Sequence, residues 1–225
     1  MSLAGMIDHT ILQPTTLISQ VEQVCEEAIK YQFASVCVPP NFVKIAHQAL
    51  AGSNVKTCTV IGFPFGYAAV EAKIAECILA MVDGAQELDV VANISAIKNA
   101  DWQYLANEIS HIMPVVKSKQ AILKVIIESG VLTDEEIIKC CELYGVAGID
   151  YLKTSTGFNG PGASKHAVQL FKKHLPSNVL IKASGGIRNR ATAEAMVAAG
   201  ASRLGCSASV AIVTDATTAN NNSNY

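Results

Sequence analysis

The chain has 225 residues, of which 50% are hydrophobic and 16% are charged, and its formal net charge is −2. A chain of this length and composition can bury a substantial core in one domain, or in two small ones at most. It lacks the excess of positive charge that a nucleic-acid surface needs. Its apolar runs are far shorter than the ~20 residues of a membrane span. We therefore expect neither a nucleic acid nor a membrane among its partners.

The placement of cysteine and histidine argues against disulfides and metal sites. The seven cysteines lie in apolar runs, as Cys37 does, or beside one another, as Cys140 and Cys141 do. A secreted disulfide framework is small and loop-rich, unlike this chain. The cysteine and histidine spacings of zinc sites are absent, and so are the basic start and long apolar stretch of a signal peptide. We expect buried free thiols, a cytoplasmic location, no metal and no other cofactor.

Eight short apolar runs recur along the chain at intervals near the ~30 residues of a strand–helix unit. They are continuous rather than alternating, as in strands that are covered on both faces. The predicted strands are residues 6–10, 35–38, 56–61, 87–91, 122–127, 149–153, 179–183 and 203–205.

Amphipathic stretches lie between these strands. Apolar positions recur at helical spacing in residues 18–31, 70–81 and 105–116. A capping box from Thr133 to Glu136 predicts the start of the fifth helix. The glycines expected to mark helix exits are Gly145, Gly148 and Gly200. In the last unit only Ser209–Thr214 can form a helix.

Eight strand–helix units in a chain somewhat shorter than ~250 residues predict an α/β fold, the (β/α)8 or TIM barrel, over residues 1–216. The alternative is an open doubly wound sheet. That fold usually has a glycine-rich fingerprint after the first strand, and Pro14-Thr-Thr16 is not one. Residues 217–225 are polar and end at Tyr225, so we expect a flexible C-terminal tail.

Two lysines are predicted near the carboxyl ends of neighbouring strands. Strand side chains alternate with period two, so Lys153 shares a face with Ile149, and Lys182 shares one with Leu180. If Ile149 and Leu180 line the barrel, both lysines do too. Buried lysines are costly unless they are paired or functional. The structural interpretation is that each pairs with a carboxylate such as Asp89, or that its register is one residue off and it is exposed.

The functional interpretation uses both lysines together. An amine attacks a carbonyl only when it is neutral, and a lysine with a pKa of ~10.4 is less than ~0.1% neutral at pH 7. A second ammonium group nearby, with partial desolvation, lowers that pKa. One lysine is then the nucleophile and the other its electrostatic activator.

Glycine-rich loops follow the last two strands. Gly185 and Gly186 lead to Arg188 after the seventh strand, and Gly205 leads to Ser207 at the eighth. The phosphate site of such barrels is commonly built from these two loops and a helix N-terminus. We therefore expect a phosphate here, although a Gly-Gly pair alone is usually a turn and Arg188 could simply start the next helix.

Segments along nearly the whole chain resemble the deoxyribose-phosphate aldolase family. They cover residues 7–12, 36–38, 59–64, 87–91, 123–128, 153–158, 182–188 and 203–205. The Lys-Thr-Ser-Thr-Gly motif that begins at Lys153 and the Lys-Ala-Ser-Gly-Gly motif that begins at Lys182 are highly specific at this spacing.

The resemblance implies a class I aldolase in a TIM barrel. Such an enzyme reversibly cleaves 2-deoxy-D-ribose 5-phosphate into acetaldehyde and D-glyceraldehyde 3-phosphate. Lys153 would form the Schiff base, Lys182 would lower its pKa, and Asp89 would belong to the proton relay. The residues carried over as phosphate contacts are Gly157, Gly186, Arg188, Gly205 and Ser207. Barrels of this family are often dimers, so a homodimer is among the expected assemblies.

The resemblance also suggests secondary residues. Asp8, Cys37 and Lys124 match positions that line the family's pocket, although Cys37 is also explained as a packed apolar residue and Lys124 as an ion-pair partner. Some members end in a tyrosine on a flexible arm, so Tyr225 is a candidate to assist proton transfer, and a frayed end is the alternative. From the residues themselves, His9 is expected to be a structural hydrogen-bonding group.

Some positions depart from the family pattern. Pro39 stands where many members have asparagine, Gln13 where lysine is common, and Ala92 where a larger residue is usual. These departures concern substrate tuning and packing more than the reaction. In addition, Glu128 is expected to cap the turn that follows it.

Two other functions remain open from the residues alone. One is a different phosphosugar-handling TIM-barrel enzyme, which need not use both lysines. The other is a catalytically silent phosphosugar-binding protein, which would need no lysine with a lowered pKa.

Overall fold

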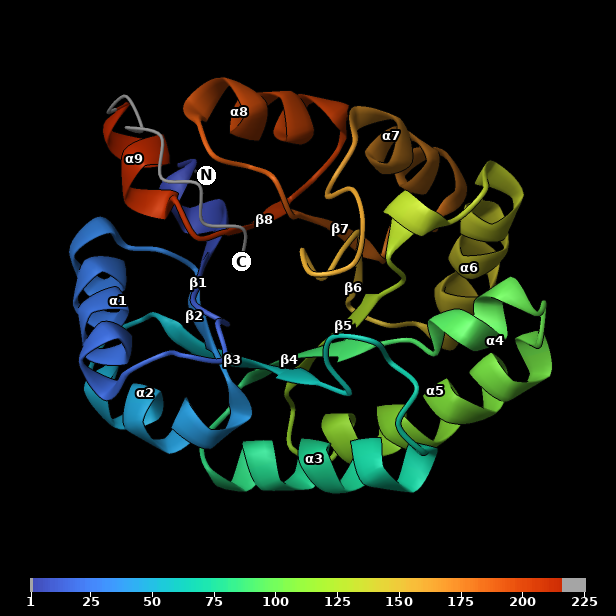
Figure 1. Ribbon diagram of the computed structural model, residues 1–225, viewed down its shortest axis with the longest axis horizontal. Coiled ribbons are helices and arrows are strands. Elements are labelled where there is room, and N and C mark those ends of the chain that lie inside the picture. Colours follow the sequence, from blue (N-terminus) through green and yellow to red (C-terminus); the bar gives the residue numbers. More distant parts are fainter. Residues whose placement is uncertain (1, 216–225) are drawn as a thin grey trace.

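A computed structural model of the chain describes residues 2–215. Eight parallel strands close into a barrel in chain order, and the helices form a ring around it (Figure 1). The strands are β1 Ile7–Thr10, β2 Ser35–Val38, β3 Lys56–Ile61, β4 Glu87–Val91, β5 Ile122–Ile126, β6 Tyr151–Lys153, β7 Leu180–Ser184 and β8 Arg203–Cys206. The predicted (β/α)8 barrel is therefore confirmed. The expected tail, residues 217–225, lies outside the described residues.

The helices alternate with the strands, except that α4 and α5 both lie between β4 and β5, and there are three short 3-10 turns, η1 to η3. The α-helices are α1 Ile18–Tyr31, α2 Val43–Ala49, α3 Val70–Val82, α4 Ile94–Lys98, α5 Trp102–Lys117, α6 Asp134–Ala147, α7 Lys165–His174, α8 Arg190–Ala199 and α9 Ser209–Thr214. The turns are η1 Ala4–Met6, η2 Pro40–Phe42 and η3 Ser129–Val131. Within residues 2–215, no helix combines the length and the apolar character that crossing a membrane requires.

The sequence places the strands to within two residues at each end. The largest difference is at β6, which begins at Tyr151 rather than at residue 149. At this point the N–H of Leu123 on β5 donates to the carboxylate of Asp150 at 2.8 Å. The N–H of Asp150 also donates to the carbonyl of Leu123 at 3.2 Å, so backbone pairing with β5 reaches back to Asp150 although the regular ladder begins at Tyr151.

The core lies between the strands and the helices, as continuous apolar strands require. In α5 the predicted positions Leu105, Ile109, Ile112 and Val116 are all buried. The helix predicted at residues 70–81 is only partly right in its buried face, because Ile78, one of the apolar residues at helical spacing there, is 46% exposed. An unexpected residue, Lys73, is fully buried on this helix and pairs with Glu108 of α5 at 2.6 Å.

Two of the helix-end signals predicted from the sequence act at α6, and a third does not. The Thr133–Glu136 capping box opens α6 as predicted, and Gly148 ends that helix in the left-handed region at φ 72°. Gly145, expected at a helix exit, lies inside α6 instead. A Cβ at this position would lie 2.8 Å from Cδ of Pro176, so the glycine permits close packing rather than a cap.

The barrel interior carries a layer of charged side chains. Lys182 is fully buried there, although Leu180, two residues earlier on β7, is 42% exposed. Leu180 begins the strand at its amino end, where the barrel opens to solvent. The expected inward direction of Lys182 is therefore correct, and Leu180 shares its face of β7 at the open end of the barrel.

Candidate active site

One carboxylate lies between the two lysines that the sequence singles out. Oδ2 of Asp89 on β4 accepts from Nζ of Lys153 at 2.5 Å and from Nζ of Lys182 at 2.7 Å. Lys153 and Lys182 are register partners on β6 and β7. All three side chains are buried or nearly so. The structure therefore brings together the three residues expected to carry the chemistry.

The other oxygen of Asp89 extends the network to β5. Oδ1 accepts from Nζ of Lys124 at 2.9 Å, and the same ammonium group lies 2.6 Å from Glu87. Asp8 on β1 completes the circle, with Oδ2 at 2.5 Å from Lys182. The interpretation of Lys124 as an ion-pair partner is confirmed.

Two members of this layer, Glu87 and Arg203, were not among the site residues expected from the sequence. Arg203 on β8 lies 2.6 Å from Asp8 and 3.0 Å from Glu87, and its guanidinium stands 5.3 Å from the ring of Tyr151. Strand periodicity contained the signal, because Glu87 lies two residues before Asp89, and Arg203 lies two before Gly205.

The charges in this layer compensate one another. Burial would raise the pKa of Asp89, but the surrounding ammonium groups outweigh it and hold that pKa well below its usual value. Burial would lower the pKa of Lys182, but the carboxylates of Asp8 and Asp89 outweigh it and raise that pKa. Lys182 is thus a fixed cation with two counterions, and the charge in direct contact with Lys153 is the carboxylate of Asp89.

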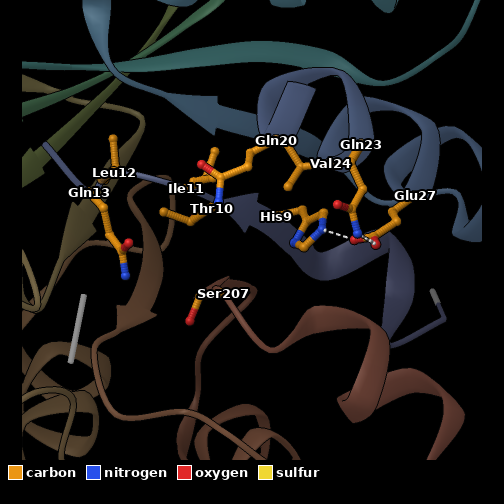
Figure 2. A pocket seen from close by; sticks show the side chains of 10 residues that line it. All are labelled: His9, Thr10, Ile11, Leu12, Gln13, Gln20, Gln23, Val24, Glu27 and Ser207. Atoms are coloured by element: carbon orange, nitrogen blue, oxygen red, sulfur yellow. Dashed lines mark hydrogen bonds and ion pairs between the residues drawn. The ribbon is translucent and has the colours of Figure 1, made fainter. Parts of the chain in front are cut away.

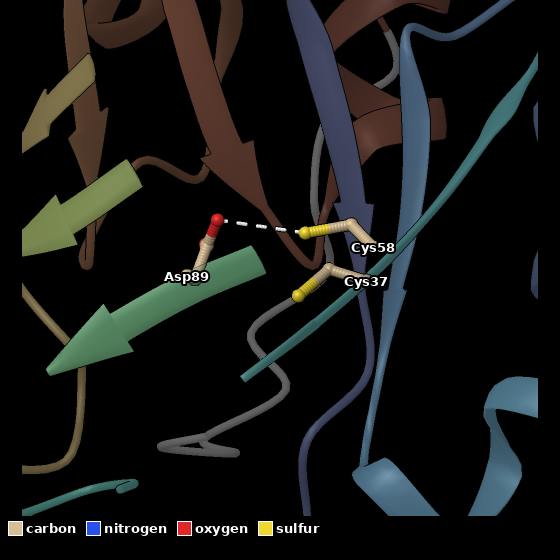
Figure 3. Close-up of side chains that lie close together, drawn as sticks. All are labelled: Cys37, Cys58 and Asp89. Atoms are coloured by element: carbon tan, nitrogen blue, oxygen red, sulfur yellow. Dashed lines mark hydrogen bonds between the residues drawn. The ribbon is translucent and has the colours of Figure 1, made fainter. Parts of the chain in front are cut away.

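Two thiols border Asp89 on the side of β2 and β3 (Figure 3). Cys37 and Cys58 are register partners, and Sγ of Cys58 lies 3.5 Å from Oδ1 of Asp89. A hydrogen bond with Cys58 lowers the pKa of the Cys37 thiol, although burial opposes it. Cys37 packs in an apolar cluster with Leu12 and Val60, in agreement with its interpretation as a packed residue.

This trio also has the spacing of metal ligands. The two sulfur atoms and a carboxylate oxygen lie within 4.8 Å of one another. The carboxylate, however, already accepts from three lysine ammonium groups. Their positive charge opposes a cation at this place, so the arrangement favours ion pairing over metal binding.

The residues expected to bind phosphate surround the same end of the barrel. Gly157 follows β6 and Gly186 follows β7, with φ of 85° and 76°. Cα of Gly157 lies 3.5 Å from where a Cβ of Gly185 would stand, so the two loops touch. Exposed Arg188 precedes the start of α8 at Arg190 rather than beginning it.

Gly205 differs from the expected loop position, because β8 continues through Cys206. A Cβ on Gly205 would lie 2.8 Å from Cβ of Ser184 and 3.3 Å from Cε of Lys182. The glycine therefore leaves room for the catalytic lysine candidate on β7. Tyr225, also expected at the site, lies outside the described residues.

Ser207 opens onto a cavity of about 240 Å³ between β1 and α1 (Figure 2). His9 lines this cavity, with Nε2 2.7 Å from Glu27 and Nδ1 2.9 Å from Oγ of Ser209. Burial lowers the pKa of His9, and the hydrogen bond with Glu27 opposes that shift. His9 is thus a structural hydrogen-bonding group, as predicted, and it ties β1 to α1 and α9.

Comparisons with known proteins agree with this geometry. A family model described as DeoC/LacD family aldolase matches residues 3–213. A deoxyribose-phosphate aldolase of Bacillus cereus is 50% identical over 213 residues, which is 95% of each chain. One of Caldanaerobacter subterraneus subsp. tengcongensis is 47% identical over 95% of this chain and 93% of its own.

Solved structures give the same result. A putative deoxyribose-phosphate aldolase from Coccidioides immitis superposes with a TM-score of 0.91 at 44% identity, over 95% of this chain and 85% of that one. The tetrameric deoxyribose phosphate aldolase from Aeropyrum pernix has a TM-score of 0.89 at 33% identity, over 96% and 91%. The chain belongs to the DeoC/LacD family of aldolases.

Proposed function

We propose that this protein is a class I aldolase that reversibly cleaves 2-deoxy-D-ribose 5-phosphate into acetaldehyde and D-glyceraldehyde 3-phosphate. The relatives that share about half of its residues carry the name of this activity. The observation that carries the proposal is the contact of Lys153 and Lys182 with one oxygen of Asp89 inside the barrel.

In this reaction Nζ of Lys153 attacks the aldehyde carbon C1, and loss of water gives an iminium ion. The cation withdraws electrons from the C2–C3 bond, which breaks as the C3 hydroxyl loses its proton. D-Glyceraldehyde 3-phosphate leaves, and an enamine remains on Lys153. Protonation at C2 and hydrolysis then release acetaldehyde.

Asp89 is the proposed proton relay. Its pKa is held well below the usual value while its lysine partners are charged. The enamine on Lys153 is neutral, so one of those charges disappears when it forms. The carboxylate then binds a proton more readily, so it can take up the proton that leaves the C3 hydroxyl and deliver it to C2 of the enamine. Lys182, fixed by Asp8 and Asp89, supplies the remaining positive charge beside Lys153.

The phosphate of the substrate is proposed to bind at Gly157, Gly186, Arg188, Gly205 and Ser207. Gly157 and Gly186 belong to loops that touch, and their left-handed backbones suit N–H groups that converge on an anion. Gly205 lies inside β8, so it would contribute to the site indirectly, by leaving space for the side chain of Lys182.

Two further proposals concern the setting of the enzyme. The seven cysteines are all buried and unpaired, which fits the reducing cytoplasm. A homodimer is proposed as its assembly. The relative from Aeropyrum pernix is described as a tetramer, so light scattering of the purified protein decides between these states.

Borohydride trapping tests the proposed function. Incubation with acetaldehyde and sodium borohydride should inactivate the protein and add a reduced two-carbon group at Lys153, identified by peptide mass spectrometry. EDTA should not change the rate of sugar phosphate cleavage. Trapping that persists in Lys153→Ala, or a label on Lys182 or Lys124, would overturn the assignment of the nucleophile.

A further inference from the structure

A buried carboxylate outside the ion network lies two residues after the end of β5. Glu128 is fully buried, and its backbone lies in the left-handed region at φ 55° and ψ 54°. This region is unfavourable for a residue with a side chain. The expected cap of the next turn is wrong, because no side-chain cap bond of Glu128 to η3 forms. The side chain is turned to another segment instead.

That segment is the loop after Lys153. Both carboxylate oxygens of Glu128 accept from the N–H of Thr156, at 3.3 and 3.2 Å, and one also accepts from the Thr156 hydroxyl. Oγ1 of Thr156 accepts in turn from the N–H of Phe158 at 3.1 Å. Gly157 lies between these two anchored residues, so Glu128 fixes the backbone on both sides of a proposed phosphate contact.

Neighbouring contacts join the same end of β5 to the start of this loop. The N–H of Ile127 donates to the carbonyl of Lys153 at 3.2 Å, and the N–H of Ser129 donates to that of Thr154 at 2.7 Å. Residues 127–129 therefore hold the backbone of the nucleophile and, through Glu128, the backbone around Gly157. One segment sets the distance between the two ends of the substrate site.

The charge on Glu128 has no counterion in direct contact among the described residues. Burial raises the pKa of Glu128, and the donors on Thr156 and the more distant Lys153 oppose that shift. A buried carboxylate without an ion pair is costly unless hydrogen bonds compensate it. Here those bonds all go to Thr156, so the cost of burial is offset only while the loop keeps this shape.

We propose that Glu128 is a positioning residue that matches the loop at Gly157 to a phosphorylated substrate held on Lys153. The inference rests on the proposed function and adds a determinant of specificity to it. Glu128 touches neither the reacting carbon nor the phosphate. It fixes the loop backbone so that its N–H groups stay at the correct distance from Lys153 for a five-carbon sugar with a terminal phosphate.

Glu128→Gln tests this inference. Glutamine keeps the size of the side chain but turns one acceptor into a donor, which cannot receive the N–H or hydroxyl of Thr156. KM for 2-deoxyribose 5-phosphate should rise about tenfold or more, and inhibition by inorganic phosphate should weaken in parallel. KM for unphosphorylated 2-deoxyribose and the rate of borohydride trapping by acetaldehyde should stay within about twofold of wild type.

Glu136→Gln is the matched control, because Glu136 also accepts from a threonine N–H, that of Thr133 at 2.8 Å, but in the cap of α6. It should leave both KM values unchanged. Thr156→Val removes the hydroxyl group that donates to Glu128, and it should also raise KM for the phosphorylated sugar. Both changes break the same contact. In the double variant Glu128→Gln/Thr156→Val, the rise in KM for the phosphorylated sugar, converted to free energy, should therefore be smaller than the sum of the two single effects.

The outcomes separate this inference from the proposed function. Equal rises in KM for both sugars, or full additivity in the double variant, would reduce Glu128 to a structural residue and overturn the inference. If Glu128→Gln does not fold, Thr156→Val alone decides between a selective and a uniform effect. Absence of trapping at Lys153 in the wild-type protein would instead overturn the proposed aldolase, whatever Glu128 does.

Discussion

Asp89 shows how one residue organises the charges of the site. Its two oxygens accept from Lys124, Lys153 and Lys182. Removal of one partner from a buried ion pair commonly costs about 3–5 kcal/mol, because the other charge is left uncompensated. Substitutions in this layer therefore affect stability as well as catalysis, and the two effects have to be measured separately.

At this scale Lys182→Met should lower the rate of sugar phosphate cleavage strongly and move the pH optimum upward. The family motifs give Lys182 the role of activating the Lys153 amine through its positive charge, and removal of that charge should move the optimum to higher pH. The pH profile of kcat/KM measures the shift, with thermal melts to confirm that the variant is folded. Lys139→Met, which removes an exposed lysine that pairs with Glu142, is the control. An unchanged profile in the methionine variant would remove Lys182 from the activating role.

At the scale of elements, β8 shows how the absence of a side chain at one position makes room for a site residue on the neighbouring strand. Gly205 leaves room for Cε of Lys182 and for Ser184 of the neighbouring strand. A close approach of this kind has no signature in composition, and the sequence suggested only a phosphate loop. The strand continues through this glycine because its φ lies outside the left-handed region.

Gly205→Ala should therefore displace Lys182 and lower kcat, with a loss of stability of about 1–3 kcal/mol from overpacking. Gly52→Ala is the control, since a Cβ there meets nothing within 4 Å and its cost comes from its φ of 78° alone. Urea unfolding and steady-state rates measure both variants. A Gly205→Ala enzyme with wild-type kcat would show that Lys182 tolerates movement.

The C-terminal segment gives another prediction at this scale, although it lies outside the described residues. The resemblance to the family makes its last residue, Tyr225, a candidate to assist proton transfer. We predict that deletion of Tyr225 slows exchange of the acetaldehyde methyl protons with deuterated water and leaves Schiff-base formation intact. Nuclear magnetic resonance follows the exchange. Equal exchange rates in both proteins would leave the tyrosine without a catalytic role.

At the scale of the whole molecule, the first and last units meet to close the barrel. β1 pairs with β8, and α9 lies between α1 and α8 (Figure 1). His9 joins these units through Glu27 of α1 and Ser209 of α9. The buried ring is thus part of the closure of the barrel.

This closure predicts a pH dependence of stability. Burial lowers the pKa of His9 below 6.5 in the folded protein, so the unfolded chain binds the proton more readily. The contribution of His9 to stability is present above pH 6.5 and is lost as the pH falls through that value. Urea midpoints of His9→Gln should fall less between pH 7.5 and 5.5 than those of wild type. His111→Gln, at an exposed site, should keep the wild-type dependence, and an identical fall in all three proteins would contradict this account.

The amino-acid sequence by itself determined the barrel, because its signals are local. Continuous apolar runs, helical periodicity and the Thr133 cap each act within a few residues, and they placed the strands to within two residues. The alternation of side chains along a strand also pointed Lys153 and Lys182 to one interior, and the family motifs named their partners.

Only the tertiary structure decided how these charges are paired. The bridging of two lysines by Asp89 and the presence of Arg203 in the same layer depend on distances across the closed barrel. The contact of Glu128 with Thr156 joins residues 28 positions apart. Glu128 looked like a local turn cap because sequence signals describe the nearest backbone. Its real partner became its neighbour only when β5 and β6 paired, and that pairing is a property of the closed sheet.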